Sequence, residues 1–315
     1  MSALIGHEAL EAALDWPVLI RQLRDWYCDN AVQAPDRQVL SIAQPDGSEA
    51  SLLIMPAWVP GDSIGVKVVT FFPGNAAKGC PTINAGYLLF DGETGQMQAA
   101  LDGDALTARR TAAASALAAD FLARKDSRHL LIVGTGQLSL AVAAAHCAVR
   151  SYTTVSIWGR SREKAEAVAE ALCAQGLPAQ AARDLEVACR AADVISTVTA
   201  STGPIIHGHW LKPGSHLDLI GAFKGDMRES DDQAITQAEL FVDLRAGASL
   251  AGDLAQPLDA GQITPGHIRA DLTELCQRAH PGRRDDTART VFKSAGMALQ
   301  DLAAANLARD HAISG

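Results

Sequence analysis

An apolar run that leads directly into a glycine turn and then a helix limits the fold of this chain more than any other feature. Residues 130–133 are Leu-Leu-Ile-Val, typical of a buried strand, and Gly134 and Gly136 follow at once. In dinucleotide-binding folds the first glycine permits a tight turn, and the second lets the backbone approach a pyrophosphate at the helix N-terminus. Ser139 replaces the usual third glycine and is small enough for close helix packing. The pattern predicts a dinucleotide site at Gly134, Thr135, Gly136, Gln137 and Leu138.

Strand-like and helix-like segments alternate from His129 onward. Strands are expected at His129–Val133, Thr154–Trp158, Asp193–Val198, His216–Ile220 and Leu240–Asp243, and helices at Leu138–Ala148, Ser161–Ala174 and Leu185–Ala191. Such alternation implies a parallel sheet covered by helices on both faces. This part of the chain is therefore expected to be an α/β, Rossmann-type doubly wound parallel sheet.

The first 105 residues have a different pattern. An amphipathic helical stretch at His7–Tyr27 precedes strand-like runs that are separated by turns, namely Gln38–Ile42, Ala50–Met55, Ile64–Phe72 and Gly86–Phe90. These runs predict an α+β region with a largely antiparallel sheet. Two further helices are expected, an Ala-rich one at Thr107–Ala123 and a long one at Asp286–Arg309.

The end of the second strand of the alternating region indicates which dinucleotide binds. Enzymes that use NAD usually carry Asp or Glu there, which accepts a hydrogen bond from the ribose 2′-hydroxyl. This chain has no carboxylate at that point and instead has Arg160, Ser161 and Arg162, which suit a 2′-phosphate. The alternative is a pair of solvated charges, but cations in a first helical turn oppose the helix dipole. The sequence thus predicts NADP(H).

A lysine lies within an otherwise apolar strand-like run, Ile64–Phe72. Lys67 either extends its ammonium group to the surface, as on an edge strand, or serves a pocket. The sequence leaves both interpretations open.

Two adjacent arginines follow a plausible helix N-cap. Arg109 and Arg110 come directly after Thr107 and Ala108, so they are expected in the first helical turn, against the dipole preference. An anion bound at that terminus would resolve the conflict, because arginine and helix N–H groups would both hold a carboxylate. Arg37, in a loop, is a third candidate for such a site.

Charge and composition exclude several classes of protein. The chain has 27 basic and 36 acidic residues, a net charge of −9, which disfavours binding to nucleic acid or to an anionic membrane surface. No apolar run approaches the roughly 18 residues of a membrane span, and the N-terminus lacks the pattern of a signal peptide. Six scattered cysteines without a C-x-x-C pair fit free thiols in a reducing cytoplasm.

Other catalytic patterns are weak. His207 and His209 have no carboxylate partner at the spacing of a zinc site, so no metal site is predicted. The G-x-S-x-G pattern of serine hydrolases does not occur. The acidic run Asp226–Asp232 is expected to be a solvated helix start.

Several short motifs together resemble a known family, the ornithine cyclodeaminase/mu-crystallin family. They cover nearly the whole chain in family order and comprise Met55–Trp58, Gly65–Lys67, Asn75 through Lys78–Thr82, Leu106–Ala113, Gly134–Gly136, Trp210–Gly214, Gly252–Asp253 and Phe292–Gly296. The resemblance implies a homodimer of two-domain chains. Residues 1–107 with 296–315 would bind substrate and dimerise, and residues 108–295 would bind the cofactor.

The resemblance also implies roles for individual residues. Lys67, Arg37 and Arg110 would surround the substrate's carboxylate and reacting carbon, with Lys67 and Arg110 taking part in catalysis and Arg110 also touching the cofactor. The residues that would line the cofactor near its nicotinamide are Thr82, Asn84, Thr199, Ile220 and Ser294.

One departure from the family pattern bears on the reaction. Cyclodeaminases carry an Asp shortly after the strand that corresponds to His216–Ile220, whereas Phe223 occupies that position here and Asp226 comes three residues later. The sequence thus resembles the branch that reduces Δ1-pyrroline-2-carboxylate and Δ1-piperideine-2-carboxylate to proline and pipecolate with NADPH. The alternatives are an ornithine cyclodeaminase with bound NAD, an alanine dehydrogenase, and a non-catalytic binding protein like mu-crystallin.

Overall fold

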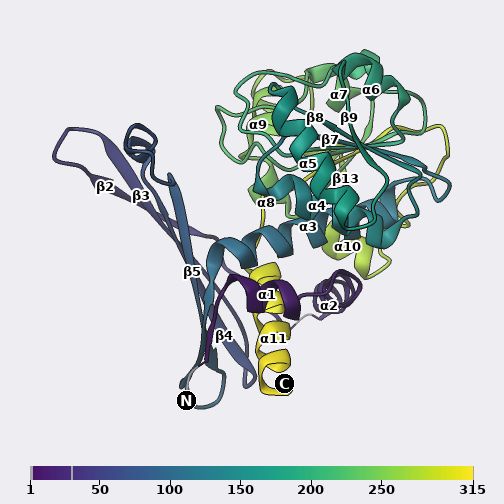
Figure 1. Cartoon of the computed structure of the whole chain (residues 1–315). Helices are drawn as coiled ribbons and strands as arrows, with labels where there is room; N and C mark the ends of the chain where they lie inside the picture. The colour runs from purple at the N-terminus through teal and green to yellow at the C-terminus, as the bar shows by residue number, and fades with distance from the viewer. Residues whose placement is uncertain (1–2, 30, 315) are drawn as a thin grey trace. The chain divides into compact units, whose positions relative to one another are not determined.

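The chain forms two compact units, which are described here one at a time (Figure 1). The structure is a computed structural model that describes residues 3–29 and 31–314. The first unit contains the residues up to Thr111 and those from Met297 onward, and the second contains Ala112–Gly296. The chain therefore leaves the first unit, builds the second, and returns to the first for its last helix.

The first unit is built on a six-stranded sheet. Its strands are β1 (Ala3–Ile5), β2 (Gln38–Ala43), β3 (Glu49–Val59), β4 (Ser63–Phe71), β5 (Ile83–Asp91) and β6 (Met97–Asp102), in the order β1-β6-β5-β4-β3-β2. Only the β1–β6 pair is parallel within this sheet, so the predicted antiparallel arrangement is confirmed. Burial alternates along the first half of β4, which places Ser63, Gly65 and Lys67 on the covered face.

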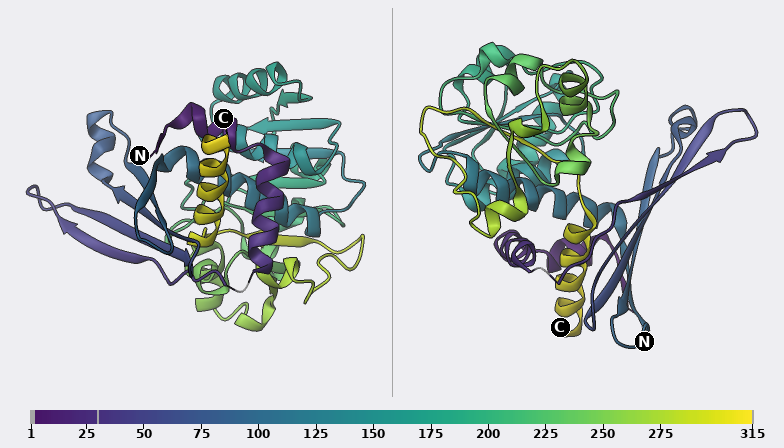
Figure 2. Two further views of the ribbon diagram at one scale, coloured as in Figure 1. Left: turned by 90° about the horizontal axis from the view of Figure 1, so that it is seen from below. Right: turned by 180° about the vertical axis from the view of Figure 1, so that it is seen from behind.

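Three helices of the first unit accompany this sheet, α1 (His7–Ala13), α2 (Trp16–Cys28) and α11 (Ala298–Ser314). Helix α11 packs against β3 and β4 and against α2 (Figure 2, right). The stretch predicted as one helix, His7–Tyr27, is two helices. The break lies at Leu14 and Asp15, because the Asp15 carboxylate accepts a hydrogen bond from Val18 N at 3.4 Å and begins α2.

The second unit is built on an eight-stranded, fully parallel sheet. Its strands are β7 (His129–Val133), β8 (Thr154–Trp158), β9 (Ala179–Ala181), β10 (Val194–Thr197), β11 (His216–Leu219), β12 (Glu239–Val242), β13 (Ile268–Asp271) and β14 (Thr290–Lys293). The order is β13-β12-β14-β11-β10-β7-β8-β9, so the direction of winding reverses between β7 and β10. The predicted doubly wound sheet is confirmed, and such a reversal is where open α/β sheets bind ligands.

Helices connect these parallel strands. They are α4 (Gln137–Val149), α5 (Arg162–Ala174), α6 (Leu185–Ala191), α7 (Asp232–Thr236), α8 (Arg245–Ala248), α9 (Gly252–Asp259) and α10 (Leu272–Cys276). The first three agree with the predicted helices to within a residue or two.

The prediction of one long helix over Asp286–Arg309 is wrong. Residues 290–293 form β14, which lies between β11 and β12, and α11 begins only at Ala298. Thr290, Val291 and Phe292 are β-branched or aromatic and suit a buried strand, and Gly296, with φ of +77°, lies between strand and helix.

The helix that contains Arg109 and Arg110 begins earlier than predicted. Helix α3 is Gly103–Leu122, and the Asp102 carboxylate accepts hydrogen bonds from Asp104 N and Ala105 N, both at 3.0 Å. Thr107 is therefore not the N-cap, and both arginines lie in the second turn.

Within the described residues, no helix combines the length and apolar character needed to cross a membrane.

Candidate functional site

Lys67 is buried within the first unit. Its side chain is 3% exposed and its Nζ lies 2.9 Å from Asp301 Oδ1 and 2.8 Å from Oδ2, so the surface interpretation is wrong. Burial lowers the pKa of Lys67 to about 8, helped by the charge of Arg110 and opposed by Asp301. An amine with this pKa exchanges its proton near neutrality.

Arg110 shares the same carboxylate. Its Nε donates to Asp301 Oδ1 at 2.9 Å and its Nη1 to Gln300 Oε1 at 2.7 Å, while Gln300 Nε2 donates to Tyr27 OH at 2.8 Å. Gln300 and Asp301 are fully buried and occupy the first turn of α11. The guanidinium is thus held at two nitrogens, and its Nη2 has no hydrogen-bond partner in the described part of the chain.

The cluster carries more positive than negative charge. Arg37, half-buried in the loop before β2, lies near enough for its charge to lower the pKa of Lys67 further, after burial and Arg110. Lys67, Arg110 and Arg37 contribute three positive charges and Asp301 one negative charge, a surplus of two. Such a cluster is suited to bind a small carboxylate, because charge-assisted hydrogen bonds strengthen out of bulk water. We call these four residues the cation cluster.

Arg109 has a different environment from its neighbour. It donates to Leu14 O and, at 3.0 Å, to Glu11 O, and its guanidinium lies 3.8 Å from the centre of the Trp16 ring. These contacts satisfy carbonyl groups at the junction of α1 and α2. The hypothesis that Arg109 helps hold an anion at the start of α3 is therefore wrong, and its role is structural.

Thr82 directly precedes β5 and Asn84 is the second residue of that strand, also in the first unit. Asn84 is exposed and paired in register with Thr70, while the Thr82 carbonyl accepts from Phe72 N at 2.8 Å. Neither side chain makes a hydrogen bond within residues 3–29 and 31–314, so both are free to meet a ligand.

The glycine turn of the second unit follows β7 as predicted. Gly134 has φ of +134°, its N donates to Trp158 O at 2.8 Å, and a Cβ there would lie 2.8 Å from atoms of Val198. Gly136 is the N-cap of α4, provides no side-chain cap, and has open space where a Cβ would point. Buried Ser139 permits close packing. The uncapped N–H groups of Gln137 and Leu138 and the open space at Gly136 fit a pyrophosphate.

The three residues predicted to bind a 2′-phosphate follow the end of β8, the strand next to β7. Arg160 is exposed, and no partner for it occurs in the described part of the chain. Ser161 is the N-cap of α5 and accepts from Lys164 N at 3.3 Å, while Arg162 donates to Glu166 at 2.7 Å one turn along α5. Arg160 is thus the arginine whose charge is free for a phosphate.

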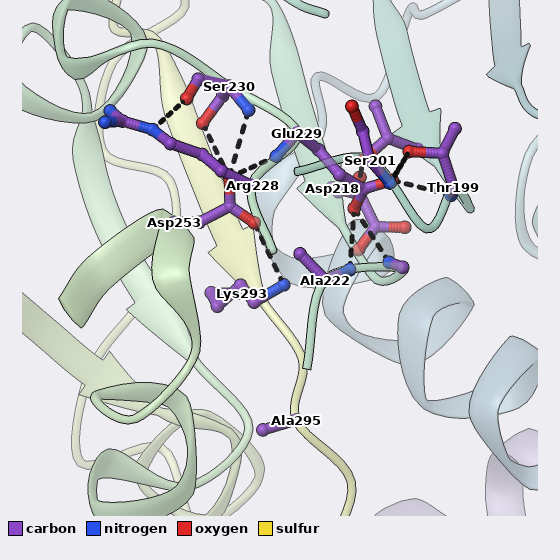
Figure 3. A network of polar contacts seen from close by, with 12 residues as sticks. Thr199, Ser201, Asp218, Ala222, Arg228, Glu229, Ser230, Asp253, Lys293 and Ala295 are labelled. Carbon is purple, nitrogen blue, oxygen red and sulfur yellow. Dashed lines mark hydrogen bonds and ion pairs between the residues drawn. The ribbon is translucent and has the colours of Figure 1, made fainter. Parts of the chain in front are cut away.

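A buried glutamate that the sequence analysis missed joins the loops after β10 and β11 (Figure 3). Glu229 is fully buried, so the prediction that the run Asp226–Asp232 is solvated is wrong at this residue, although Asp226 is exposed. The predicted helix start is confirmed, because Asp231 is the N-cap of α7. One carboxylate oxygen accepts from Thr199 N at 2.6 Å and Thr199 Oγ1 at 2.8 Å. The other accepts from Gly221 N at 2.7 Å and Ala222 N at 3.3 Å, next to the buried Ile220.

Glu229 is held in turn by Asp253 and Lys293. Asp253 Oδ1 accepts from Glu229 N at 2.9 Å and Ser230 N at 3.0 Å, and its Oδ2 lies 3.2 Å from Lys293 Nζ. The side chains of Asp253 and Lys293 are fully buried. The network therefore ties α9 and β14 to the loops that follow β10 and β11.

Ser294, predicted to line the cofactor, is bound to a buried acid at the end of β12. Its hydroxyl donates to Asp243 Oδ2 at 3.1 Å, and the same oxygen accepts from Ala295 N at 2.9 Å and Gly296 N at 2.6 Å. Burial raises the pKa of Asp243, while these hydrogen bonds oppose the shift. Asp243 therefore fixes the loop after β14.

A serine, a histidine and an aspartate also meet inside the second unit. Ser115 Oγ lies 2.9 Å from His146 Nε2 and donates to Asp218, which also accepts from Ser196 Oγ at 2.7 Å. All four side chains are fully buried between the sheet and helices α3 and α4. A nucleophile needs access to its substrate, so this cluster is structural.

Phe223, which the family resemblance aligns with the Asp of cyclodeaminases, lies in the loop after β11. It is half-buried, and Lys224 Nζ lies 5.8 Å from the centre of its ring. No carboxylate is present at this position of the loop after β11.

Known proteins resemble this chain over nearly its whole length. The profile of the Ornithine cyclodeaminase/mu-crystallin family matches residues 11–315. The Delta(1)-pyrroline-2-carboxylate reductase of Paracoccus denitrificans is 39% identical, covering 92% of this chain and 90% of that protein. The ketimine reductase mu-crystallin of Rattus norvegicus is 38% identical, with coverages of 91% and 88%.

A solved structure has the same fold. The Thermococcus litoralis Delta(1)-pyrroline-2-carboxylate reductase, in complex with NADH and L-proline, superposes with a TM-score of 0.92 at 29% identity, over 99% of this chain and 98% of that one. The profile match, the two relatives and the shared fold agree, and this chain belongs to the ornithine cyclodeaminase/mu-crystallin family.

Proposed function

We propose that this chain is an oxidoreductase that reduces cyclic ketimine acids, Δ1-pyrroline-2-carboxylate to L-proline and Δ1-piperideine-2-carboxylate to L-pipecolate. The observation that carries the proposal is the buried cation cluster, in which Lys67 and Arg110 share Asp301 and retain a surplus of positive charge. The reductase activities for which the Paracoccus and rat relatives are named support the same reaction class. Phe223, in place of a carboxylate, argues against cyclodeamination.

The residues of the cation cluster have distinct tasks in this reaction. Arg110, through Nη2, and Arg37 hold the substrate carboxylate. Lys67 Nζ lies beside them and keeps the imine nitrogen protonated, which makes the neighbouring carbon a better hydride acceptor. When bound, the nicotinamide supplies the hydride. Positioning of the two reactants provides much of the rate.

NADP(H) is the proposed cofactor, and Arg160 is the residue that supports this choice. The solved Thermococcus protein contains NADH, so family membership alone does not decide between the two dinucleotides. Here the β8–α5 turn offers no carboxylate to a ribose hydroxyl, and the Arg160 guanidinium is exposed and unpaired among the described residues. A free guanidinium there suits a 2′-phosphate.

Arg160→Gln should raise KM for NADPH about 10- to 100-fold and leave KM for NADH within about twofold, because a charge-assisted contact to phosphate is lost. Initial rates with each cofactor measure the change. Arg162→Gln is the matched control, since that guanidinium is already paired with Glu166. Equal losses in the two variants, or a loss with both cofactors, would contradict the assignment to Arg160.

The pH dependence of kcat/KM should follow Lys67. Burial lowers the pKa of its ammonium group to about 8, and the protonated form is the one that assists the imine. We therefore expect kcat/KM to be high below pH 8 and to fall about tenfold per pH unit well above it. A profile that stays flat to pH 9.5, with the substrate's own ionisation taken into account, would show that Lys67 does not act in this form.

The test of the proposed function follows absorbance at 340 nm with Δ1-pyrroline-2-carboxylate, using NADPH and NADH in parallel. Oxidation of NADPH with formation of L-proline is the expected result. Ammonia release from ornithine, with neither cofactor oxidised, would replace the proposal with cyclodeamination. Oxidation of NADH with pyruvate and ammonia would replace it with alanine dehydrogenation. Ligand binding without turnover would indicate a binding protein.

We further propose that the chain forms a homodimer through the sheet of the first unit. We also propose that it is located in a reducing cytoplasm. Apolar side chains are exposed on this sheet, among them Val39 at 60% and Leu40 at 47% on the edge strand β2, and Met97 at 44% on β6. An edge strand with exposed apolar side chains can pair with a second chain. The cysteines are free thiols. Sedimentation equilibrium should give twice the chain mass of 33.1 kDa, whereas the mass of one chain would refute the dimer.

A further inference from the structure

One buried carboxylate joins two loops at the carboxyl edge of the parallel sheet. Glu229 receives four hydrogen bonds, two from Thr199 in the loop after β10 and two from Gly221 and Ala222 in the loop after β11. The two loops also touch directly, because a Cβ on Gly221 would collide with Thr199 O and N. Glu229 and this close approach therefore tie the two loops to each other.

All four groups that contact the Glu229 carboxylate are hydrogen-bond donors. A carboxylate satisfies them, since its two oxygens only accept. A glutamine at this position keeps one accepting oxygen and turns an NH₂ group toward the other pair of donors. Glu229 is also fixed through its backbone, because its N–H donates to Asp253, which pairs with the buried Lys293. The four donors thus favour the ionised carboxylate, while burial raises the pKa of Glu229 and opposes ionisation.

The order of the strands indicates which part of a dinucleotide these loops face. The glycine turn follows β7, and Arg160 follows β8, on one side of the winding reversal. Thr199 and Gly221 follow β10 and β11, on the other side. A dinucleotide binds across such a reversal, with its pyrophosphate at the glycine turn. Its adenosine half therefore lies toward β8, and its nicotinamide half lies toward β10 and β11.

We propose that Glu229 is a positioning residue for the nicotinamide half of the cofactor, acting through the loops at Thr199 and Gly221. This inference rests on the proposed use of a nicotinamide dinucleotide. Among the described residues, the Glu229 carboxylate accepts hydrogen bonds only from atoms of the two loops. Its carboxylate holds the two loops in register, so that the surface they present to the nicotinamide and its ribose is formed before the cofactor binds.

The test compares binding of the whole cofactor with binding of its adenosine half. Titration calorimetry would measure Kd for NADPH and for adenosine 2′,5′-bisphosphate with the full-length wild type and Glu229→Gln. We expect Kd for NADPH to rise at least about tenfold, because two charge-assisted hydrogen bonds are lost. Kd for adenosine 2′,5′-bisphosphate should change less than about twofold, because the glycine turn and Arg160 remain intact.

Asp218→Asn is the matched control. Asp218 is as deeply buried as Glu229 in the same unit, but its carboxylate binds the side chains of Ser115 and Ser196 rather than the two loops. This variant should lower Tm and leave both Kd values near those of the wild type. A double variant, Thr199→Val with Glu229→Gln, should weaken NADPH binding by less than the product of the two single effects.

Each outcome decides between a positioning role and the alternatives. Selective loss of NADPH binding in Glu229→Gln supports the inference. Equal losses for NADPH and the bisphosphate, or the same losses in Asp218→Asn, would mean that Glu229 only stabilises the unit. Unchanged NADPH binding would overturn the inference directly. If the wild type binds neither NADPH nor NADH, the proposed function fails and the inference fails with it.

Discussion

Lys67→Met is expected to reduce kcat for Δ1-pyrroline-2-carboxylate at least about 1,000-fold, because general acid catalysis and a charge next to the reacting group are both lost. Met matches the length of the lysine stem and keeps the packing against α11. Asp301 stays paired with Arg110 at 2.9 Å, so no buried charge is left without a partner. The fold should therefore survive the substitution.

Two measurements separate this chemical loss from a loss of structure. Kd for NADPH should stay within a few-fold of wild type, because the glycine turn and Arg160 belong to the second unit, and the change in Tm should be small. Turnover within tenfold of wild type would remove Lys67 from catalysis. Loss of cofactor binding together with turnover would show that the substitution had damaged the fold instead.

Arg110→Met is expected to lower kcat/KM at least about 100-fold, chiefly through a higher KM for the imino acid, because the guanidinium holds the substrate carboxylate. The same change leaves Gln300 Oε1 without its donor and leaves Asp301 with Lys67 alone. Steady-state kinetics over a range of substrate concentrations separates KM from kcat.

Arg109→Met is an unusually close control, since it removes the same charge from the adjacent residue of α3. Its guanidinium binds the carbonyl groups of Glu11 and Leu14 and stacks on Trp16, so the loss should appear in Tm and leave KM within about twofold. An equal rise of KM in the two variants would indicate general electrostatic attraction rather than a specific contact by Arg110.

The different roles of Arg109 and Arg110 show where sequence-based prediction reached its limit. The two residues are alike in sequence context, and both were predicted to hold an anion at a helix start. One helical step of about 100° directs one side chain to the α1–α2 junction and the other to α11. Only the packing of α11, whose Asp301 lies 191 residues from Arg110, distinguishes them.

Local sequence patterns gave correct predictions for features that depend on residues adjacent in the chain. The glycine turn, the strands on either side of it and the parallel sheet were predictable, because apolar runs and glycine spacing encode them directly. The buried state of Lys67 was not, since a strand lysine takes its environment from whatever covers the sheet. Glu229 was missed because it lies in a run of charged residues, and its burial comes from contacts with Thr199 and Asp253.

β14 was missed for a related reason. Residues 290–293 are few, and the helical periodicity of the residues that follow dominated the pattern. Its place between β11 and β12 depends on the tertiary structure and not on the local sequence. A strand this short is identified by what pairs with it on both sides, and its neighbours precede it by dozens of residues.

The late position of β14 has a consequence for biosynthesis. A nascent chain that ends before Thr290 has β11 and β12 without the strand that lies between them, so two inner edges of the sheet remain unpaired. The residues that follow β14 supply α11, which carries Asp301 to Lys67 and Arg110. Both units are thus completed by the same stretch of polypeptide, and a product terminated before Thr290 lacks the means to finish either one.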